Sequence, residues 1–174
     1  SASRIHEGDI CIDATAGRGN DTAYLCGLAG ESGKIIAFDI QQEAIDSTAK
    51  LLEEKGLSSR AELILGSHTQ MDSYAEEGTV SCITFNFGWL PGGDHTVHTM
   101  KDTSIEAVKK ALRLLKQGGL ISMILYYGRD TGFEEKEALL EFVKTIDSAE
   151  YSVITVDFSN RPNCPPIPIF ILRE

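Results

Sequence analysis

Short apolar runs alternate with segments of helical periodicity along the chain, and this alternation limits the fold more than any other feature. Strands that alternate with helices of about ten residues or more pair in parallel, because each helix returns the chain to the same end of the sheet. Strands buried between two helix layers are apolar throughout, as in the segment LISMILYY at residues 120–127. The sequence therefore predicts an α/β protein with a doubly wound, mostly parallel sheet.

The pattern predicts a sheet of seven strands, with four helices that pack against it. The last two strands have no helix between them, and their connection, residues 159–166, holds three of the five prolines. Proline cannot extend a strand ladder, so these two strands should form an antiparallel hairpin at one edge. The expected strands are Asp9–Ala14, Lys34–Ile40, Ala61–Leu65, Val80–Phe87, Leu120–Tyr127, Tyr151–Phe158 and Ile167–Leu172, and the expected helices are Asn20–Ala29, Gln42–Lys55, Ser104–Lys116 and Phe133–Ile146.

Length and charge narrow the class of protein. A chain of 174 residues without repeats or linkers suits a single domain, residues 1–174. Its net charge of −10 disfavours non-specific binding of polyanions, and its apolar runs are shorter than the roughly 18 residues of a membrane span. The four cysteines form no C-x-x-C pair, so we expect a reduced, cytoplasmic protein in which Cys11 and Cys82 are buried apolar groups.

The first expected strand runs into a glycine-containing turn, DATAGRG at residues 13–19, and a helix follows it. Glycines let the backbone approach a ligand closely, and the helix aims its N-terminal amides at that ligand. Asp39 follows Gly19 by twenty residues, at the end of the second strand, where a carboxylate accepts both hydroxyls of a ribose. Together these features predict a nucleoside-containing cofactor, whereas two glycines alone would also fit an ordinary strand-to-helix turn.

The residues around the turn indicate which cofactor it binds. Asp13 precedes the glycines, where a carboxylate would repel phosphates and attract an ammonium or sulfonium group. Thr22 takes the place of the third glycine of the dinucleotide fingerprint. Both features favour S-adenosylmethionine over a nicotinamide dinucleotide. The residues expected to bind the cofactor are Asp13, Thr15, Ala16, Gly17, Gly19, Asn20, Asp21, Thr22, Asp39, Ile40, His68 and Asn86.

The turn resembles the D/E-x-G-x-G-x-G signature of class I methyltransferases, with Thr15 in place of the first glycine. The resemblance implies a Rossmann-like fold and places the adenine beside the residues that follow the third strand. His68 is the candidate contact there, with a solvated loop histidine as the alternative. Asn86, at the end of the fourth strand, matches the first residue of the D/N-P-P-Y/F motif of amino-group methyltransferases, although the adjacent prolines are absent.

Four longer segments are similar to one bacterial family, the MnmM-type or rRNA methylase family. These segments are DATAGRGNDTAYL, FNFGWLPGGDHTVHT, YYGRDTGFEEKEALLEF and NRPNCPPI. The resemblance spans essentially the whole chain. It implies methyl transfer from S-adenosylmethionine to the aminomethyl group of 5-aminomethyl-2-thiouridine at the tRNA wobble position. Family members carry more chain before the first strand, so it also implies a preceding N-terminal helix.

On this interpretation the loops after the fourth and later strands hold the substrate. The transferred methyl requires a neutral amine, which Asn86 would orient and from which Asp94 or His95 would accept a proton. Trp89, in the same loop, would stack on the base. Further candidates for substrate contact are Tyr127, Asn160 and Asn163, for which a purely structural role is the equal alternative.

Other hypotheses stay open. A methyltransferase acting on rRNA or a small molecule would share the cofactor half, and a nicotinamide-binding oxidoreductase or a non-catalytic cofactor-binding protein is a more remote alternative. The expected partner is tRNA, and a homodimer is compatible with the sequence. No metal site is expected, because the four histidines lack acidic or cysteine companions at ligand spacing. Cations near the strand ends would hold RNA locally: Arg18, Lys101, Arg129 and Arg161.

Overall fold

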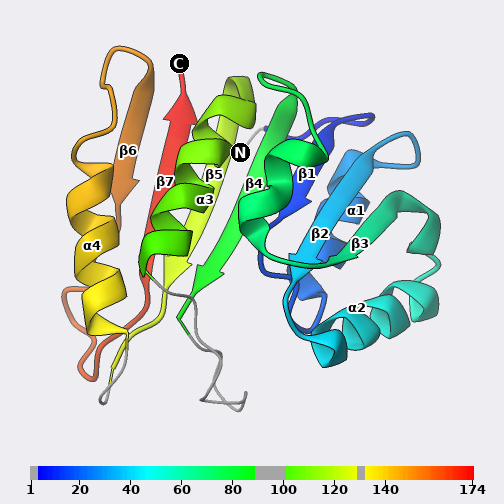
Figure 1. Cartoon of the computed structure of the whole chain (residues 1–174), viewed down its shortest axis with the longest axis horizontal. Helices are drawn as coiled ribbons and strands as arrows, with labels where there is room; N and C mark the ends of the chain where they lie inside the picture. Colours follow the sequence, from blue (N-terminus) through cyan, green and yellow to red (C-terminus); the bar gives the residue numbers. More distant parts are fainter. Residues whose placement is uncertain (1–3, 89–100, 129–131) are drawn as a thin grey trace.

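The structure, a computed structural model, describes residues 4–88, 101–128 and 132–174. Within these residues the strands form a single sheet with helices on both of its faces (Figure 1). The strands are β1 (Ile10–Asp13), β2 (Lys34–Asp39), β3 (Ala61–Leu65), β4 (Val80–Phe87), β5 (Leu115–Leu125), β6 (Tyr151–Thr155) and β7 (Ile167–Arg173). The helices are α1 (Asn20–Ala29), α2 (Gln42–Glu54), α3 (Lys101–Leu114) and α4 (Phe133–Val143), with short 3-10 helices η1 (Ser58–Arg60) and η2 (His68–Ser73).

The strand order is β3-β2-β1-β4-β5-β7-β6. The strands from β3 to β5 in this order pair in parallel, and β7 runs antiparallel to both β5 and β6. The chain moves outward from β1 to β3 and then returns to β4 on the other side of β1, so the order reverses between β1 and β4. In such sheets ligands bind beyond the carboxyl ends of the strands at the reversal point. The predicted doubly wound sheet and its antiparallel edge pair are confirmed.

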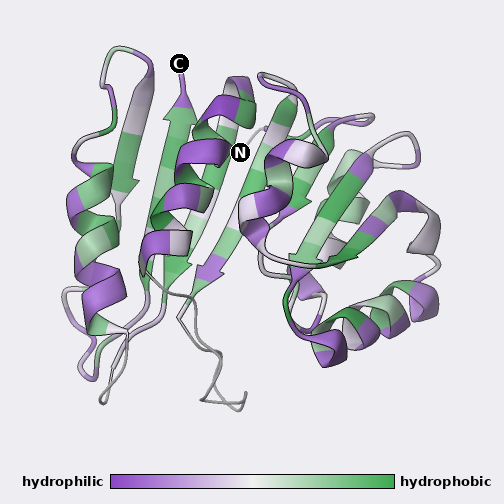
Figure 2. Cartoon of the chain, viewed as in Figure 1, coloured by the Kyte–Doolittle hydropathy of each residue, from purple (hydrophilic) through white to green (hydrophobic). Residues whose placement is uncertain are grey.

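Helices cover both faces of the sheet. Because successive residues of a strand point to opposite faces, each central strand contributes side chains to two cores. Ile12 and Ile36 join the core that includes α3 and α4, whereas Cys11, Ile35 and Cys82 join the core that includes α1. Figure 1 shows α3 and α4 in front of the sheet and α1 behind it. In Figure 2 the central strands are coloured hydrophobic, while α2 and α3 turn many hydrophilic residues outward. The apolar strand runs thus reflect two-sided burial, and Cys11 and Cys82 are buried as predicted.

The boundary between α3 and β5 lies earlier than predicted. α3 ends at Leu114, although the pattern predicted a helix to Lys116, and β5 begins at Leu115, although a strand was expected only from Leu120. The register between β4 and β5 shifts after Leu115. The glycine pair at 118–119 therefore lies inside β5, in an irregular segment where residues outside the ladder tolerate glycine well.

The antiparallel pair at the edge is also shorter than predicted. β6 ends at Thr155 and not at Phe158, after the N–H of Val156 donates to the carbonyl of Pro168 at 2.9 Å. The connection to β7 therefore begins at the carboxyl end of β5, where β7 starts beside Leu125. In the parts of the chain that the structure describes, no helix is long and apolar enough to cross a membrane.

Candidate active site

The turn between β1 and α1 lies at the carboxyl edge of the sheet, beside the point where the strand order reverses. Gly17 (φ 54°) and Gly19 (φ 82°) adopt left-handed conformations that side chains disfavour. A Cβ on Gly19 would also lie 2.9 Å from the Cα of Thr48 in α2. Ala16 is buried behind the turn, and Asn20 is exposed at the start of α1. The N-terminus of α1 is therefore directed toward the ligand edge, where it favours negative or polar groups.

Asp39, at the end of β2, ties this turn to the neighbouring strand. Its Oδ2 accepts the N–H of Gly17 at 3.0 Å, and its Oδ1 accepts the N–H of Gln41 at 3.0 Å. Each carboxylate oxygen keeps a lone pair for another donor. Ile40, the next residue, is 57% exposed and offers an apolar surface at the same edge. Asp39 thus stands where the sequence predicted it, and its contact with a ribose stays a prediction.

Asp13 is completely buried at the end of β1. Its Oδ2 accepts the hydroxyl of Thr22 at 2.6 Å, and its Oδ1 accepts the N–H of Thr15 at 3.2 Å and the hydroxyl of Thr84 at 3.4 Å. Burial raises the pKa of Asp13 to about 6, the hydrogen bond from Thr22 opposes this rise, and the nearby charge of Asp21 adds to it. Asp13 therefore stabilises the turn by accepting hydrogen bonds from residues before and after the glycines. Thr22 has a clear structural reason to replace the third glycine, because its hydroxyl binds this carboxylate.

Asn86, near the end of β4, is joined to the turn at two points. Its backbone N–H donates to the Thr15 hydroxyl oxygen at 2.8 Å, and its side-chain Nδ2 donates to Oδ2 of Asp21 at 2.9 Å. Thr15 and Asp21 flank the glycines on either side. The residue expected to meet the substrate amine thus contacts the segment expected to meet the cofactor.

His68 is buried in η2 and not solvated, so the alternative of a solvated loop histidine is wrong. Its side chain is 7% exposed, and its ring lies edge-on to Phe85 and Phe87 at centroid distances of 6.1 and 6.0 Å. Burial lowers the pKa of His68, which favours the neutral imidazole. Its Nε2 has no hydrogen-bond partner among the described residues. A contact between His68 and a cofactor stays a prediction.

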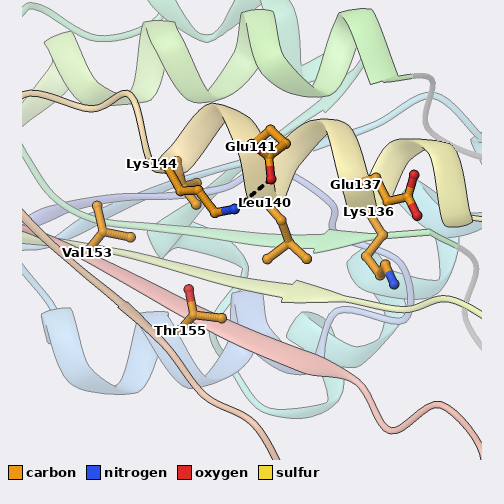
Figure 3. Close-up of a pocket in the computed structure, with 8 residues that line it drawn as sticks. Lys136, Glu137, Leu140, Glu141, Lys144, Val153 and Thr155 are labelled. Atoms are coloured by element: carbon orange, nitrogen blue, oxygen red, sulfur yellow. Dashed lines mark hydrogen bonds and ion pairs between the residues drawn. The ribbon is translucent and has the colours of Figure 1, made fainter.

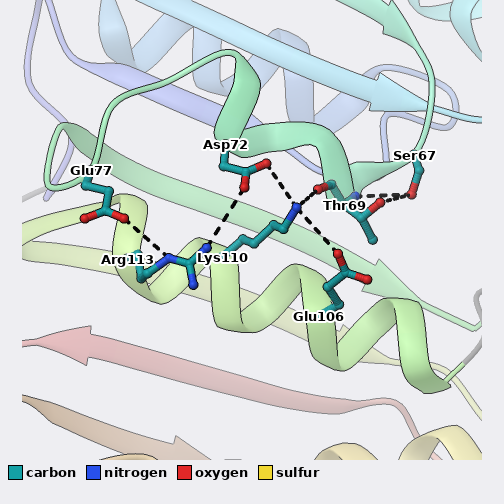
Figure 4. A network of polar contacts seen from close by, with 7 residues as sticks. All are labelled: Ser67, Thr69, Asp72, Glu77, Glu106, Lys110 and Arg113. Carbon is teal, nitrogen blue, oxygen red and sulfur yellow. Dashed lines mark hydrogen bonds and ion pairs between the residues drawn. The ribbon is translucent and has the colours of Figure 1, made fainter.

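A network of polar contacts holds η2 against α3 (Figure 4). Lys110 of α3 donates to the carbonyl of Thr69 at 2.6 Å and to Oδ1 of Asp72 at 3.1 Å. Ser67 caps η2 by accepting the N–H of Thr69 at 3.2 Å. Arg113, one turn further along α3, forms longer ion pairs with Asp72 and Glu77. Lys110 was not predicted from the sequence, although a cation beside the apolar stripe of an amphipathic helix was a usable signal.

A family model described as "Putative rRNA methylase" matches residues 35–172. The chain belongs to this rRNA methylase family. It is 36% identical to a chloroplastic tRNA (mnm(5)s(2)U34)-methyltransferase from Arabidopsis thaliana, over 98% of this chain, and spans 65% of the length of that relative. The family resemblance recognised in the sequence is confirmed.

Solved structures of similar proteins have the same fold. A putative rRNA methylase from Clostridium thermocellum superposes with a TM-score of 0.94 at 47% identity, covering 98% of this chain and 91% of the other. A putative methyltransferase from Streptococcus mutans, solved in complex with SAH, gives a TM-score of 0.88 at 36% identity, with the same two coverages. The Rossmann-like methyltransferase fold that the sequence predicted for this chain is confirmed.

The substrate side is partly described. Tyr127 follows β5, its ring lies edge-on to Phe133 at 5.7 Å, and the amine of Lys136 lies 4.4 Å from its ring centroid. Asn160 and Asn163 are exposed in the connection before β7. The predictions for Trp89, Asp94, His95 and Arg129, and for the side chain of Lys101, lie outside the described residues.

The connection before β7 approaches the end of β5 closely. Asn163 (φ 65°) and Cys164 (φ 52°) both adopt left-handed conformations, which are uncommon for residues with side chains. A Cβ on Gly128 would lie 3.4 Å from the Cβ of Cys164, so this loop packs beside Gly128. The structure thus brings Asn163 to the same edge as Tyr127.

Residues that the structure describes line a cavity and a groove beside the sheet. A cavity of about 460 Å³ lies between α1 and the strands β4 and β5; Asp21 and Asn86 line it together with apolar residues such as Leu28 and Ile124. A groove of about 630 Å³ runs between α4 and β6 (Figure 3). There the charged pair Lys144 and Glu141, 2.6 Å apart, borders apolar side chains. The cavity beside α1 is lined by residues of the candidate site, whereas the groove beside α4 is not.

Gly88 is a further residue of this edge that was not predicted from the sequence. It follows β4 with φ 89°, and a Cβ there would lie 2.2 Å from the carbonyl oxygen of Tyr126. The N–H of Tyr126 in turn donates to the carbonyl of Phe87 at 2.9 Å. Glycine therefore lets the chain leave β4 close beside the end of β5. The sequence did contain a signal, because Gly88 follows the motif residue Asn86 with a single aromatic residue between them.

Proposed function

We propose that the protein is an S-adenosylmethionine-dependent methyltransferase that N-methylates the aminomethyl group of 5-aminomethyl-2-thiouridine at the tRNA wobble position. The observation that carries this proposal is the position of Asn86, at the carboxyl end of β4 and hydrogen-bonded to both sides of the glycine turn. An amide at this position suits a substrate with an amino group. Membership of the rRNA methylase family and the similarity to a tRNA wobble-uridine methyltransferase support the same reaction.

The residues at the carboxyl edge fit the cofactor. The glycines of the turn leave room for a ligand against the backbone, and Asp39 keeps lone pairs that suit ribose hydroxyls. Ile40 directly follows β2 and Leu65 ends the paired strand β3, both with exposed apolar side chains, which suits the face of an adenine. The cofactor supplies an electrophilic methyl group on sulfur.

The protein's task in such a transfer is mainly alignment, because the leaving thioether is neutral and stable. The amine must be neutral to use its lone pair, and the transfer forms an N–C bond as the S–C bond breaks. Asn86 accepts one N–H of the amine through Oδ1 and so directs the lone pair. Asp94 or His95 accepts the released proton, directly or through water.

The RNA would lie over the ends of β5 and β6. Aromatic rings there carry cations beside them: Lys136 lies over the half-buried Tyr127, and Arg161 lies 5.5 Å from the ring centroid of the exposed Phe158. Aromatic rings stack on bases and cations pair with phosphates, so such pairs suit an unpaired loop of RNA. Asn160 and Asn163 add donors and acceptors beside them. This local surface suits an anticodon loop despite the net charge of −10.

The decisive experiment is nucleoside mass spectrometry of tRNA that carries 5-aminomethyl-2-thiouridine, after incubation with the protein and S-adenosylmethionine. We expect the methylaminomethyl nucleoside to form, and to form much less with Asn86→Ala. Ribosomal RNA incubated in parallel tests the alternative that the family description favours. Methylation of rRNA without methylation of the tRNA would overturn the proposed substrate but not the proposed cofactor.

A further inference from the structure

Two hydrogen bonds hold Asn86 from opposite ends of the residue. The hydroxyl of Thr15 accepts the backbone N–H at 2.8 Å, and the carboxylate of Asp21 accepts Nδ2 of the side chain at 2.9 Å. Thr15 lies before the glycines of the turn and Asp21 lies after them, in the first turn of α1. The strand that carries Asn86 is therefore fixed to the cofactor turn through side chains and not only through the sheet.

The contact with Asp21 determines which way the amide of Asn86 faces. A carboxylate has acceptors only, so it binds the NH₂ group of the amide and not its oxygen. Oδ1 of Asn86 must then point away from Asp21. An amide whose oxygen and nitrogen exchanged places would set two acceptors against each other at 2.9 Å. Asp21 thus selects one of the two amide orientations.

The support for Thr15 and Asp21 is itself built into the fold. The N–H of Thr15 donates to the buried carboxylate of Asp13, and the hydroxyl of Thr22, next to Asp21, donates to the same carboxylate. The two residues that bind Asn86 are thus held by one buried side chain, Thr15 directly and Asp21 through its neighbour Thr22. The position of the first glycine in the methyltransferase signature, where this chain has Thr15, gains a specific role.

We infer that Thr15 and Asp21 are positioning residues that fix the backbone and the amide of Asn86 so that Oδ1 receives an N–H of the substrate's amine. This inference rests on the proposed function. Both residues act through Asn86 in this inference, although the sequence predicted that Thr15 and Asp21 bind the cofactor. A cofactor-binding role would appear in the affinity for S-adenosylhomocysteine, and a positioning role would appear in kcat.

The first test is a double-mutant cycle in kcat, measured by single-turnover formation of the methylated nucleoside. Asp21→Asn should lower kcat about 10- to 100-fold, because a misplaced amide costs alignment. In the Asn86→Ala background the same substitution should change kcat by less than about twofold. The matched control is Asp46→Asn, because Asp46 accepts an amide N–H from Gln42 at the same kind of distance, 2.8 Å, on the surface of α2.

Thr15 provides an independent variant. Thr15→Val keeps the shape of the side chain but removes the acceptor for the N–H of Asn86, and should lower kcat about tenfold. Thr15→Ser restores the hydroxyl and should recover most of the activity. Calorimetry with S-adenosylhomocysteine should give dissociation constants within about threefold of the wild-type value for both variants.

A second test does not depend on the substrate. In an NMR spectrum the side-chain NH₂ signals of Asn86, identified by their loss in Asn86→Ala, should shift in Asp21→Asn and stay in place in Asp46→Asn. Unchanged signals in Asp21→Asn, or an equal kcat loss in both backgrounds, would overturn the inference. Failure of the wild-type protein to methylate the tRNA would overturn the proposed substrate alone, since the NMR test would still report on Asn86.

Discussion

The hydroxyl of Thr22 donates a hydrogen bond of 2.6 Å to Oδ2 of Asp13, a carboxyl that is completely buried beneath the cofactor turn. Burial raises the pKa of Asp13 to about 6 from an ordinary value of 3.8. Between about these two pH values the folded protein keeps a proton that the unfolded chain has lost. The contribution of Asp13 to stability therefore falls as the pH rises through this range, and is constant above it.

Asp13→Asn should remove this dependence on pH. The free energy of unfolding of the wild type, minus that of Asp13→Asn, should fall by about 3 kcal/mol from the acidic to the neutral end of the range. Denaturant unfolding at a series of pH values measures this difference. The surface variant Asp46→Asn should run parallel to the wild type, and a parallel course for Asp13→Asn would contradict the assignment.

Gly88 and Gly78 flank β4 and provide a matched pair for the end of that strand. Both have positive φ, 89° and 72°, but a Cβ on Gly88 would meet the carbonyl oxygen of Tyr126 at 2.2 Å, whereas a Cβ on Gly78 would meet nothing within 4 Å. Alanine at either position bears the cost of a left-handed conformation, about 1 kcal/mol. Only Gly88→Ala must also move the end of β5.

We therefore expect Gly88→Ala to lower the free energy of unfolding by about 2 kcal/mol more than Gly78→Ala does. Methyl transfer should fall further in Gly88→Ala, because the residue lies two positions after Asn86. Denaturation curves and single-turnover kinetics test the two expectations separately. Equal losses of stability in the two variants would show that the chain relaxes away from Tyr126 at little cost.

Much of the fold follows from the sequence because its determinants are local. Continuous apolar runs predicted two-sided burial of the strands, and the prolines between residues 159 and 166 predicted the antiparallel pair at the edge. The boundary between the third helix and the fifth strand was predicted too late, because the glycine pair at 118–119 fits a helix end and a strand irregularity equally well. Only the pairing of Leu115 with β4 distinguishes the two.

The sequence predicted which residues form the candidate site better than it predicted the contacts between them. Asp13, Asp39 and Asn86 were identified from their places at strand ends, and the structure brings all three to one edge of the sheet. Their partners could not be predicted, since Thr15 and Asn86 lie 71 positions apart and meet only through the register of β1 and β4. The burial of His68 likewise depends on the distant rings of Phe85 and Phe87.

Lys110 should support the cofactor edge through η2, which carries His68. Lys110→Met removes a hydrogen bond of 2.6 Å to the carbonyl of Thr69 and an ion pair with Asp72. We expect a loss of about 1–2 kcal/mol in the free energy of unfolding and a severalfold weaker affinity for S-adenosylhomocysteine. Arg113→Met is the control, because Arg113 is more exposed and its ion pairs with Asp72 and Glu77 are longer. This substitution should cost less than about 0.5 kcal/mol.

Lys136 and Arg161 should carry the electrostatic part of RNA binding. Both cations lie over aromatic rings near the ends of β5 and β6, at 4.4 Å from Tyr127 and 5.5 Å from Phe158. Each phosphate contact contributes about one unit to the dependence of log Kd on log salt concentration. Lys136→Gln and Arg161→Gln should therefore each weaken tRNA binding severalfold at low salt and reduce this slope by about one unit.

The control for this prediction is Lys50→Gln. It removes an exposed cation of α2, a helix that packs near β2 and β3 and not near β5 and β6. It should leave the salt dependence of tRNA binding unchanged. All three variants should bind S-adenosylhomocysteine like the wild type, because none touches the glycine turn or Asp39. A slope that drops equally in Lys50→Gln would mean that RNA senses only the total charge of the protein. A slope that drops only in the other two variants would assign the RNA to the edge where β5 and β6 end.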